Sequence, residues 1–334
     1  MNLIIEKSTD PYHNLAREEI LLSAVREDTI YLWRNRPSVI VGRHQNTLAE
    51  IDEEAAKKEK IKIVRRLTGG GAVFHDLGNI NFSYIFAGGD FDEKKNRGLE
   101  LMLSFLRSCG ARCYATGRND ICMRDSAGRE VKVSGTAMTQ RGERGIFHGC
   151  VLFDCDLSRL ERVLTPRREK LTSKGIASVR SRVSNLREMV PALGETEADA
   201  FFAAWCEALT EECRLIEAQD LGEAEAAQEL METKYRSRDW NFGRNPVCTV
   251  ENSRTFPVGT VEFHAEVKGG VITSCCFTGD YLAERDFREI ASLLCRSPFT
   301  DDGMEKALGE IDTKSFFGTD NLGEILRFLA GRSV

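Results

Sequence analysis

The chain has 334 residues, of which 42% are hydrophobic and 29% are charged, a composition that excludes a disordered chain, a collagen-like fibre and a coiled-coil rod. The net charge of −6 gives no overall basic footprint for nucleic acid, although a local basic patch is compatible with that sum. No apolar run approaches the ~18 residues of a membrane span, and residues 1–7 do not read as a signal peptide. We expect a cytoplasmic protein that binds neither nucleic acid nor membrane.

Up to about residue 190, strand-like and helix-like runs alternate. Apolar residues at helical spacing, such as Leu15, Ala16 and Ile20, predict a helix over residues 12–25. Runs of branched and aromatic residues predict strands. We expect strands over residues 30–33, 38–41, 61–64, 79–86, 131–137 and 146–153, and further helices over residues 51–60, 98–108 and 195–215.

Residues 211–232 are acidic, with eight acidic residues and one basic residue. Gly243 and Pro246 follow and are typical of a domain boundary. After them the pattern predicts a hairpin over residues 258–267 and 271–277, then short helices over residues 282–295, 303–311 and 321–329. We therefore expect a catalytic domain over residues 1–245, with an acidic helix and linker from about residue 217, and a small α+β domain over residues 246–334.

The eleven cysteines are odd in number and form no paired CxxC clusters. This spacing disfavours a structural zinc site. Without a secretory signal, we expect reduced thiols, most of them buried as small hydrophobic residues.

Residues 65–76 are the most informative stretch. Arg65 and Arg66 follow a predicted strand and precede the glycines at 69–71. Glycines let the backbone approach a ligand and expose N–H groups to an anion, and a guanidinium adds charge for a carboxylate or phosphate. The alternative is a tight turn between two strands. No Gly-Lys-Ser/Thr follows, so this is not a Walker loop.

A second group of polar residues begins at Asn119 and Asp120 and continues with Lys132. A lysine that faces a pocket can hold a carboxylate and a phosphate together. The alternative is a solvated lysine on an edge strand. The residues around Lys132 must decide between the two.

Residues 159–187 hold nine basic and two acidic residues. In a chain of net charge −6, this asymmetry indicates a surface for a polyanion, an acidic protein or a nucleotide. The alternative is a solvated loop. The stretch lacks aromatic residues, which argues against single-stranded nucleic acid.

Together these segments resemble the lipoate–protein ligase A family. The resemblance appears in the order and spacing of several motifs along the whole chain. They are residues 10–19, 65–79, 117–120, 132–137, 148–149, 174–183 and 240–243.

The resemblance implies an enzyme that activates lipoate with ATP as lipoyl-adenylate and transfers the lipoyl group to a lysine of a carrier. The implied carriers are the E2 subunits of 2-oxoacid dehydrogenases and the H protein of glycine cleavage, docked through the basic stretch from Arg159 to Arg187. The implied fold is α+β, with a large mixed-sheet catalytic domain that resembles the cores of biotin ligases and class II synthetases, plus a small α+β accessory domain. We expect a monomer.

By resemblance, Lys132 is the catalytic residue, which bridges the lipoyl carbonyl and the phosphate. The residues implied for ATP and the adenylate are Arg66, Gly71, Ala72, Val73, Phe74, Asn119, Lys132, Lys174, Ser178, Arg180 and Arg182. The residues implied for lipoate are Thr68, Gly69, Gly70, Gly71, His75, Asn79, Lys132, Gly135 and His148. Asp120 is a candidate Mg²⁺ ligand on the chemistry of its oxygens alone.

Alternatives to this interpretation remain. Cys150 stands where the family often has threonine, and related transferases use a cysteine nucleophile without ATP. The chain could therefore be an ATP-independent lipoyl or octanoyl transferase, or a non-enzymatic module that binds carriers. We expect Cys150 to be a buried strand residue. His75 and His148 are candidate bases for the acceptor lysine, although a structural role is the simpler expectation for both.

Overall fold

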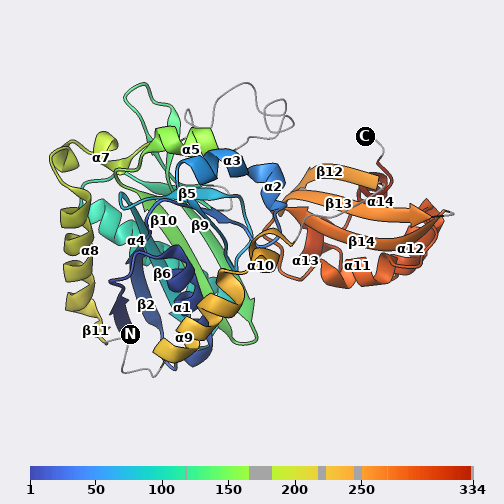
Figure 1. The fold of residues 1–334 in the computed structure, drawn as a ribbon, viewed down its shortest axis with the longest axis horizontal. Coiled ribbons are helices and arrows are strands. Elements are labelled where there is room, and N and C mark those ends of the chain that lie inside the picture. The colour runs from blue at the N-terminus through green and yellow to red at the C-terminus, as the bar shows by residue number, and fades with distance from the viewer. Residues whose placement is uncertain (117–118, 165–182, 217–222, 244–249, 269, 332–334) are drawn as a thin grey trace. The chain divides into compact units, whose positions relative to one another are not determined.

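The computed structural model describes residues 1–116, 119–164, 183–216, 223–243, 250–268 and 270–331 (Figure 1). Their contacts divide the chain into two compact units. The first unit comprises Met1–Ile40, Glu50–Leu67 and Val73–Asn241, and the second comprises Val41–Ala49, Thr68–Ala72 and Phe242–Val334. Because two short segments of the N-terminal half belong to the second unit, a single division of the chain at residue 245 stays a prediction.

The first unit is built on an eight-stranded sheet with the order β11-β1-β2-β6-β10-β9-β8-β7. β1 pairs in parallel with β2 and β11, whereas the other neighbouring strands pair antiparallel. This confirms the predicted α+β fold with a large mixed sheet. The strands are β1 (Asn2–Ile5), β2 (Thr29–Arg34), β6 (Asn79–Phe86), β7 (Tyr114–Thr116), β8 (Asp120–Arg124), β9 (Glu130–Arg141), β10 (Arg144–Leu152) and β11 (Arg214–Leu215).

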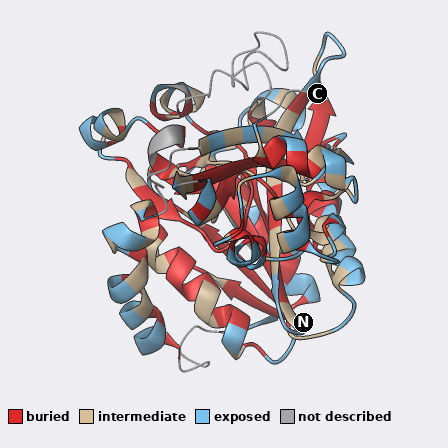
Figure 2. Ribbon diagram, turned by 90° about the vertical axis from the view of Figure 1, so that its right-hand side faces the viewer, coloured by how far each residue is buried: buried red, intermediate tan, exposed pale blue. Residues whose placement is uncertain are grey.

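Helices bury both faces of this sheet, which explains why β2 reads as an almost continuous apolar run. Ile30 and Leu32 belong to a core cluster with α4 (Phe91–Ser108) and α8 (Ala198–Glu212). Tyr31 and Trp33 belong to a second cluster, with α1 (Pro11–Ala24). Successive strand residues point to opposite faces, so one strand serves both clusters. Figure 2 shows the strands mostly buried and the outer sides of several helices exposed.

Stacked aromatic rings hold α8 on the sheet. Trp205 of α8 is 0% exposed and stacks on Phe105 of α4, with ring centroids 4.6 Å apart. It also stacks on Phe82 of β6 at 5.7 Å. Replacing a buried ring of this size by alanine typically lowers the free energy of unfolding by about 3–5 kcal/mol. The predicted amphipathic helix near residues 195–215 is therefore confirmed as α8.

A smaller sheet with the order β4-β3-β5 completes the first unit and consists of β3 (Ser38–Val41), β4 (Lys62–Arg65) and β5 (Val73–His75). The remaining helices of the N-terminal part are short. They are α2 (Thr47–Glu50), α3 (Glu53–Lys58), α5 (Leu157–Val163), α7 (Leu186–Met189), a 3₁₀ turn (Pro191–Leu193), α9 (Ala224–Leu230), a π-helical turn (Met231–Tyr235) and α10 (Arg238–Phe242).

The C-terminal part of the second unit is a three-stranded antiparallel sheet of β12 (Val250–Phe256), β13 (Gly259–Lys268) and β14 (Val271–Gly279). Its apolar side chains share one core cluster with the helices. The predicted hairpin is thereby confirmed as β13 and β14. The helices are α11 (Arg288–Leu294), α12 (Asp301–Leu308), α13 (Lys314–Phe317) and α14 (Leu322–Leu329).

Two predicted helix starts are wrong, each for a local reason. α4 begins at Phe91 and not at residue 98, because the Asp90 carboxylate accepts the N–H of Glu93 and caps the helix. Residues 282–287 are not helical, because Leu282 donates its N–H to the carbonyl of Val258 and α11 starts only at Arg288. The strands β1, β5, β7, β8, β11 and β12 were not expected. Five of these strands have at most five residues and give a weak pattern, whereas β12 is longer but mostly polar.

In the described part of the chain, no helix combines the length and the apolar character that crossing a bilayer requires.

Glu223, just before α9, is a buried carboxylate whose two oxygens have no hydrogen-bond partner among the described residues. Burial raises the pKa of Glu223 to about 7 from 4.5, although Arg17 acts in the opposite direction. A folded-state pKa above the unfolded value means that the native state keeps a proton that the unfolded chain has lost. Glu223 therefore destabilises the fold progressively as the pH rises through that interval.

We expect Glu223→Gln to melt at a higher temperature than the wild type at pH 8 and at nearly the same temperature near pH 4.5. Glutamine stays neutral at both pH values, whereas ionisation of the buried Glu223 carboxylate at pH 8 destabilises the wild type. Thermal unfolding at four pH values measures this difference. The matched control is Glu225→Gln, an exposed carboxylate two residues further on, which should follow the wild type. A difference in melting temperature between Glu223→Gln and the wild type that stays constant with pH would contradict this account.

Candidate active site

One face of the large sheet carries polar side chains in its buried interior. Along β6, Asn79, Asn81 and Ser83 alternate with apolar residues and are at most 2% exposed. Alternate residues of a strand share a face. In the adjacent β10, Cys150 pairs with Asn81 and His148 pairs with Ser83. A buried polar face of this kind is a candidate binding site, because buried polar groups need partners.

Lys132 reaches this face through an irregularity in β9. Gly135 lies opposite Cys150 in the ladder and three residues after Lys132. In a regular strand, residues three apart point to opposite faces. The register between β8 and β9 shifts between Ile121 and Cys122, where β9 contains one extra residue. As a result, a Cβ on Gly135 would lie 2.9 Å from the Lys132 amine.

The Lys132 amine forms an ion pair with the Asp120 carboxylate of β8, at 2.6 Å. The two side chains are 28% and 40% exposed, so solvent and ligands have access to the pair. On the other side of β9, Ser184 donates its N–H to the Lys132 carbonyl at 3.0 Å, and Val183 forms a parallel bridge with Lys132. The lysine backbone is thus held from both sides while its amine remains accessible.

Glu18 of α1 forms hydrogen bonds to two residues of the polar face. It is 0% exposed, and one carboxylate oxygen accepts hydrogen bonds from Ser83 Oγ at 2.6 Å and from His148 Nδ1 at 2.9 Å. Ser83 in turn accepts a hydrogen bond from Trp33 Nε1 at 3.0 Å. These bonds fix the tautomer of His148, because Nδ1 must carry the proton that it donates.

Arg66 and His75 are both buried but differ in charge, because Arg66 is positive and His75 is neutral at pH 7. Burial lowers the pKa of Arg66 to about 10, so the guanidinium stays positive at neutral pH, and it donates a hydrogen bond to the Ile40 carbonyl at 3.0 Å. Burial lowers the pKa of His75 to about 3, and Arg66 and His148 act in the same direction. Asn35 Nδ2 donates to His75 Nδ1 at 3.2 Å, which leaves the proton on Nε2. His75 is therefore a neutral donor and a poor base.

The glycine loop belongs to the second unit, as part of Thr68–Ala72. Gly70 has a φ of +85°, and its N–H donates to the Tyr281 carbonyl at 3.2 Å. A Cβ on Gly69 would lie 2.3 Å from the same carbonyl oxygen, so this position requires glycine for a close backbone approach. A Cβ on Gly71 would meet no atom within 4 Å. Two of the three glycines thus shape the contact with Tyr281.

The remaining predicted residues that the structure describes lie in β5, in the turn before β8 and in the segment Thr68–Ala72. Phe74 is buried and pairs with Val39 in the small sheet, and Val73 pairs with Ile40. The Asn119 carbonyl accepts hydrogen bonds from the N–H and the hydroxyl of Thr136, at 2.7 and 3.2 Å. Thr68 is buried and precedes the glycines, and Ala72, half-buried, follows them. Lys174, Ser178, Arg180 and Arg182 lie outside the described residues.

Several buried polar atoms of this face have no hydrogen-bond partner among the described residues. They are the Oδ1 of Asn79, the Nδ2 of Asn81, the Nε2 of His75 and the Oε2 of Glu18. An unpaired buried polar group costs about 1–3 kcal/mol. Both donors and acceptors are present in this set, which fits a ligand that carries both kinds of polar group.

Sequence reasoning missed Glu18, Trp33, Asn81 and Ser83 of this site. A signal for two of them was present, because Asn79, Asn81 and Ser83 interrupt an otherwise apolar strand at every second position. Glu18 lies in the motif at residues 10–19 but was given no role there, and Trp33 carried no comparable signal.

In the described residues, no group of three or more His, Cys, Asp or Glu side chains is arranged to hold a metal ion. Asp120 offers a single carboxylate, which is paired with Lys132. A Mg²⁺ ion commonly takes only one or two protein carboxylates and completes its shell with phosphate oxygens and water. Asp120 therefore fits a metal that arrives with a phosphate group, and does not form a metal site by itself.

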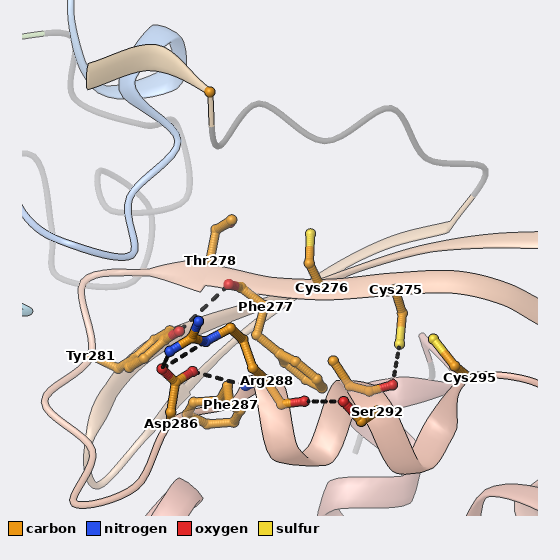
Figure 3. A pocket seen from close by; sticks show the side chains of 12 residues that line it. Cys275, Cys276, Phe277, Thr278, Tyr281, Asp286, Phe287, Arg288, Ser292 and Cys295 are labelled. Atoms are coloured by element: carbon orange, nitrogen blue, oxygen red, sulfur yellow. Dashed lines mark hydrogen bonds and ion pairs between the residues drawn. The ribbon is translucent and has the colours of Figure 1, made fainter. Parts of the chain in front are cut away.

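A separate cavity of about 460 Å³ lies in the second unit, between β14 and α11 (Figure 3). Its wall is mainly apolar and includes Phe277, Phe287 and three cysteines. Asp286 at its rim pairs with Arg288, and burial raises the pKa of the Cys275 thiol far above its usual range. Among the predicted site residues that the structure describes, none lines this cavity.

The ends of the basic stretch are already paired with acids. Arg159 and Arg162 both contact the Glu59 carboxylate, at 3.1 and 2.6 Å. Arg187 contacts Asp154 at 2.6 Å. These three arginines therefore stabilise the fold of the first unit, and the remaining basic residues of the stretch lie outside the described part of the chain.

Two family models match the chain. The model described as the lipoyl protein ligase A/B catalytic domain matches residues 10–210, and the model described as the bacterial lipoate protein ligase C-terminus matches residues 245–329. The lipoate-protein ligase LplJ of Bacillus subtilis (strain 168) is 34% identical over 314 residues, which are 92% of this chain and 93% of that protein.

Solved structures resemble this fold. P. falciparum LipL1 in complex with lipoate has a TM-score of 0.79 at 21% identity, over 98% of this chain and 99% of that one, and shows the fold alone. A bipartite lipoate protein ligase from Thermoplasma acidophilum, solved in a study that includes its E2 lipoyl domain, has a TM-score of 0.63 at 28% identity, over 75% and 98%. A lipoate-protein ligase A bound with ATP has a TM-score of 0.61 at 26% identity, over 73% and 98%.

The environment of Cys150 predicts an unreactive thiol. All ten described cysteines are free, and Cys150 is buried as expected. Burial raises the pKa of Cys150, although Lys132 and Arg66 oppose that change. A thiol reacts as the thiolate, so both burial and pKa disfavour alkylation.

We expect a brief treatment with iodoacetamide at pH 7.5 to leave Cys150 unmodified in the native protein and to modify it fully in guanidinium chloride. Peptide mass spectrometry reads both states. Cys295, which is partly exposed, serves as the internal control and should be alkylated faster than Cys150 in the native protein. Rapid native labelling of Cys150 would contradict the buried assignment.

Proposed function

Since the chain belongs to the lipoate–protein ligase family, we propose that it activates lipoate with ATP as lipoyl-adenylate and then transfers the lipoyl group to a lysine of an apo carrier protein. In the first step the lipoate carboxylate attacks the α-phosphorus of ATP, and pyrophosphate leaves. In the second step the amine of the carrier lysine attacks the carbonyl of the mixed anhydride, and AMP leaves. The ligase A structure bound with ATP supports the use of the nucleotide.

The observation that carries this proposal is the position of the Lys132 amine. The β9 irregularity directs it to the buried polar face, over Gly135 and 2.6 Å from Asp120. The first step brings two anions together, so it needs positive charge held in place before the reaction. Lys132 would leave Asp120 and bridge the lipoyl carbonyl and the α-phosphate.

Arg66 would supply the second positive charge on the acyl-phosphate side, since its guanidinium stays protonated after burial. Asn79, His75 and His148 would pair with polar atoms of the acyl group, and the apolar residues of the same face would receive its hydrocarbon chain. Asn119 and β5 would form part of the nucleotide site. Thr68–Ala72 would contribute backbone N–H groups, with Gly71 the most open of the glycines.

Mg²⁺ would be held by Asp120 together with phosphate oxygens. The ion would neutralise part of the phosphate charge during the first step. Exchange of the Lys132–Asp120 ion pair on nucleotide binding would free both side chains, the amine for the reacting anions and the carboxylate for the metal.

For the second step, the candidate histidines among the described residues are not suited to act as strong bases. His75 is neutral with a pKa of about 3, and His148 Nδ1 is bound to Glu18. Alignment of the carrier lysine with the activated carbonyl would then supply most of the rate of transfer.

The proposed carriers are lipoyl domains of E2 subunits and the H protein, in a cytoplasmic setting and with the ligase as a monomer. The T. acidophilum study of a ligase and its E2 lipoyl domain supports the class of partner. In the basic stretch, Arg159, Arg162 and Arg187 are engaged with acids of the same chain, so an electrostatic contact with an acidic carrier would depend on the basic residues between them.

We expect Lys132→Met to reduce lipoyl-adenylate formation by about 100-fold or more, as when a charge-stabilising donor is removed from an active site. A single-turnover reaction with lipoate, ATP and Mg²⁺, without carrier, measures the adenylate by mass spectrometry. Lys62→Met is the matched control, since Lys62 lies in β4 and pairs with Asp10 away from this face. Equal adenylate yields from the two variants would refute the role of Lys132.

We expect Cys150→Ala to retain both half-reactions within about threefold, since a buried neutral thiol adds only packing at this position. The measurement follows the mass shift of an apo H protein with lipoate and ATP, and separately with an octanoyl carrier donor without ATP. ATP-independent modification that is lost in Cys150→Ala would identify a cysteine transferase in place of a ligase.

A further inference from the structure

Residues 211–244 lie between the two stretches that the family models match, 10–210 and 245–329. In the structure, most of this interval is not a loose linker. Residues 223–241, which we call the brace, form α9, the π-helical turn and most of α10. The whole brace belongs to the first unit, together with Arg66, Lys132 and the polar residues of β6.

The brace is tied to α1 on the side that bears Glu19. Lys234 Nζ and the Tyr235 hydroxyl both donate to Glu19 Oε2, at 2.6 and 2.9 Å. The Lys234 amine also lies 4.0 Å from the centre of the Trp240 ring. Glu19 directly follows Glu18, so the helix that positions His148 is held by the brace at the next residue.

The brace is tied to β4 at Arg65, the residue before Arg66. The N–H of Arg65 donates to Asn241 Oδ1 at 2.8 Å, and the carbonyl of Arg65 accepts from Trp240 Nε1 at 2.8 Å. The Arg65 side chain also binds the brace. Its Nε donates to the Trp240 carbonyl at 2.9 Å, and its Nη2 donates to the Asn241 carbonyl at 3.1 Å. Arg65 and Asn241 are 0% and 3% exposed.

These bonds replace a missing strand. Among the described strands, β4 is an edge strand of the small sheet, so no described strand pairs with the outward N–H and C=O of its last residue. The side chains of Asn241 and Trp240 pair with both groups. Asn241 Nδ2 also donates to the carbonyls of Tyr235 and Ser237, at 2.7 and 3.0 Å, which anchors the amide in the brace itself. The backbone is thereby fixed one residue before the Arg66 guanidinium enters the site.

We propose that Trp240 and Asn241 are positioning residues for Arg66, which hold the Arg65 backbone so that the guanidinium meets the acyl-phosphate during adenylate formation. The proposal rests on the proposed ligase function for the reaction, but its anchoring step can be tested without that reaction. It gives the C-terminal end of the brace, which follows the acidic residues 211–232, a role in adenylate formation.

A double-mutant cycle tests whether Asn241 acts through Arg66. We expect Asn241→Ala to lower the kcat/KM of adenylate formation by about tenfold in the wild-type background and by less than about twofold in the Arg66→Gln background, because coupled residues do not add. Trp240→Phe, which keeps an aromatic ring but removes the Nε1–H donor, should show the same pattern as Asn241→Ala. Penalties that multiply in the double variants would show a general structural role and overturn the proposal.

Tyr235→Phe is the matched control, since it removes the hydrogen bond to Glu19 within the same brace but leaves Arg65 untouched. It should change adenylate formation by less than about twofold in both backgrounds. A loss as large as that of Asn241→Ala would indicate that any weakening of the brace has the same effect.

Hydrogen exchange tests the anchoring step independently of activity. We expect the peptide that contains residues 63–67 to exchange at least about tenfold faster in Asn241→Ala than in the wild type or Tyr235→Phe, because the Arg65 N–H loses its acceptor. Unchanged exchange would overturn the anchoring. If the wild type forms no adenylate, the proposed function fails, while the exchange result still decides whether the brace holds the backbone at Arg65.

Discussion

The structure depends on one constraint: polar side chains that are buried between α1 and the large sheet must find hydrogen-bond partners. Glu18 satisfies part of this need, because one of its oxygens accepts from both Ser83 and His148. Atoms of Asn79, Asn81 and His75 have no partner among the described residues, and each such atom costs about 1–3 kcal/mol. A ligand that pairs with these groups would stabilise the fold, so the proposed binding would be linked to stability at this face.

The charges of the site follow from the same burial. Burial leaves the Arg66 guanidinium positive and His75 neutral, since the pKa of arginine starts high enough to remain above neutral pH after it is lowered. Lys132 differs because its amine is partly exposed and already paired with Asp120. One cation is therefore held rigidly and the other by an exchangeable ion pair. In the proposed reaction, this arrangement would let the site receive two anionic reactants without a permanent cluster of unpaired positive charges, which would destabilise the free protein.

Sequence patterns predicted many of the regular elements of both units, and the motif order identified the family. The errors lie where a local pattern is overridden by capping or by contacts distant in sequence. A single aspartate extended α4 by nearly two turns, and the acidic interval predicted as a helix leading into a linker is partly packed against α1 through Glu19. The predicted roles of Lys174, Ser178, Arg180 and Arg182 stay predictions, as do those of the glycine loop, in which the Gly70 N–H bonds to Tyr281.

The sequence by itself determined which residue types are available for the chemistry, because composition, periodicity and motif spacing are properties of short stretches. The tertiary structure decided how they meet. Glu18 and His148 are 130 residues apart in the chain, and Arg65 and Asn241 are 176 apart. No local pattern encodes such pairs, since they form only when helix and strand faces pack together. The direction of Lys132 was also decided by the fold, because one extra residue in β9, defined only by its pairing with β8, places the amine on the face of Gly135.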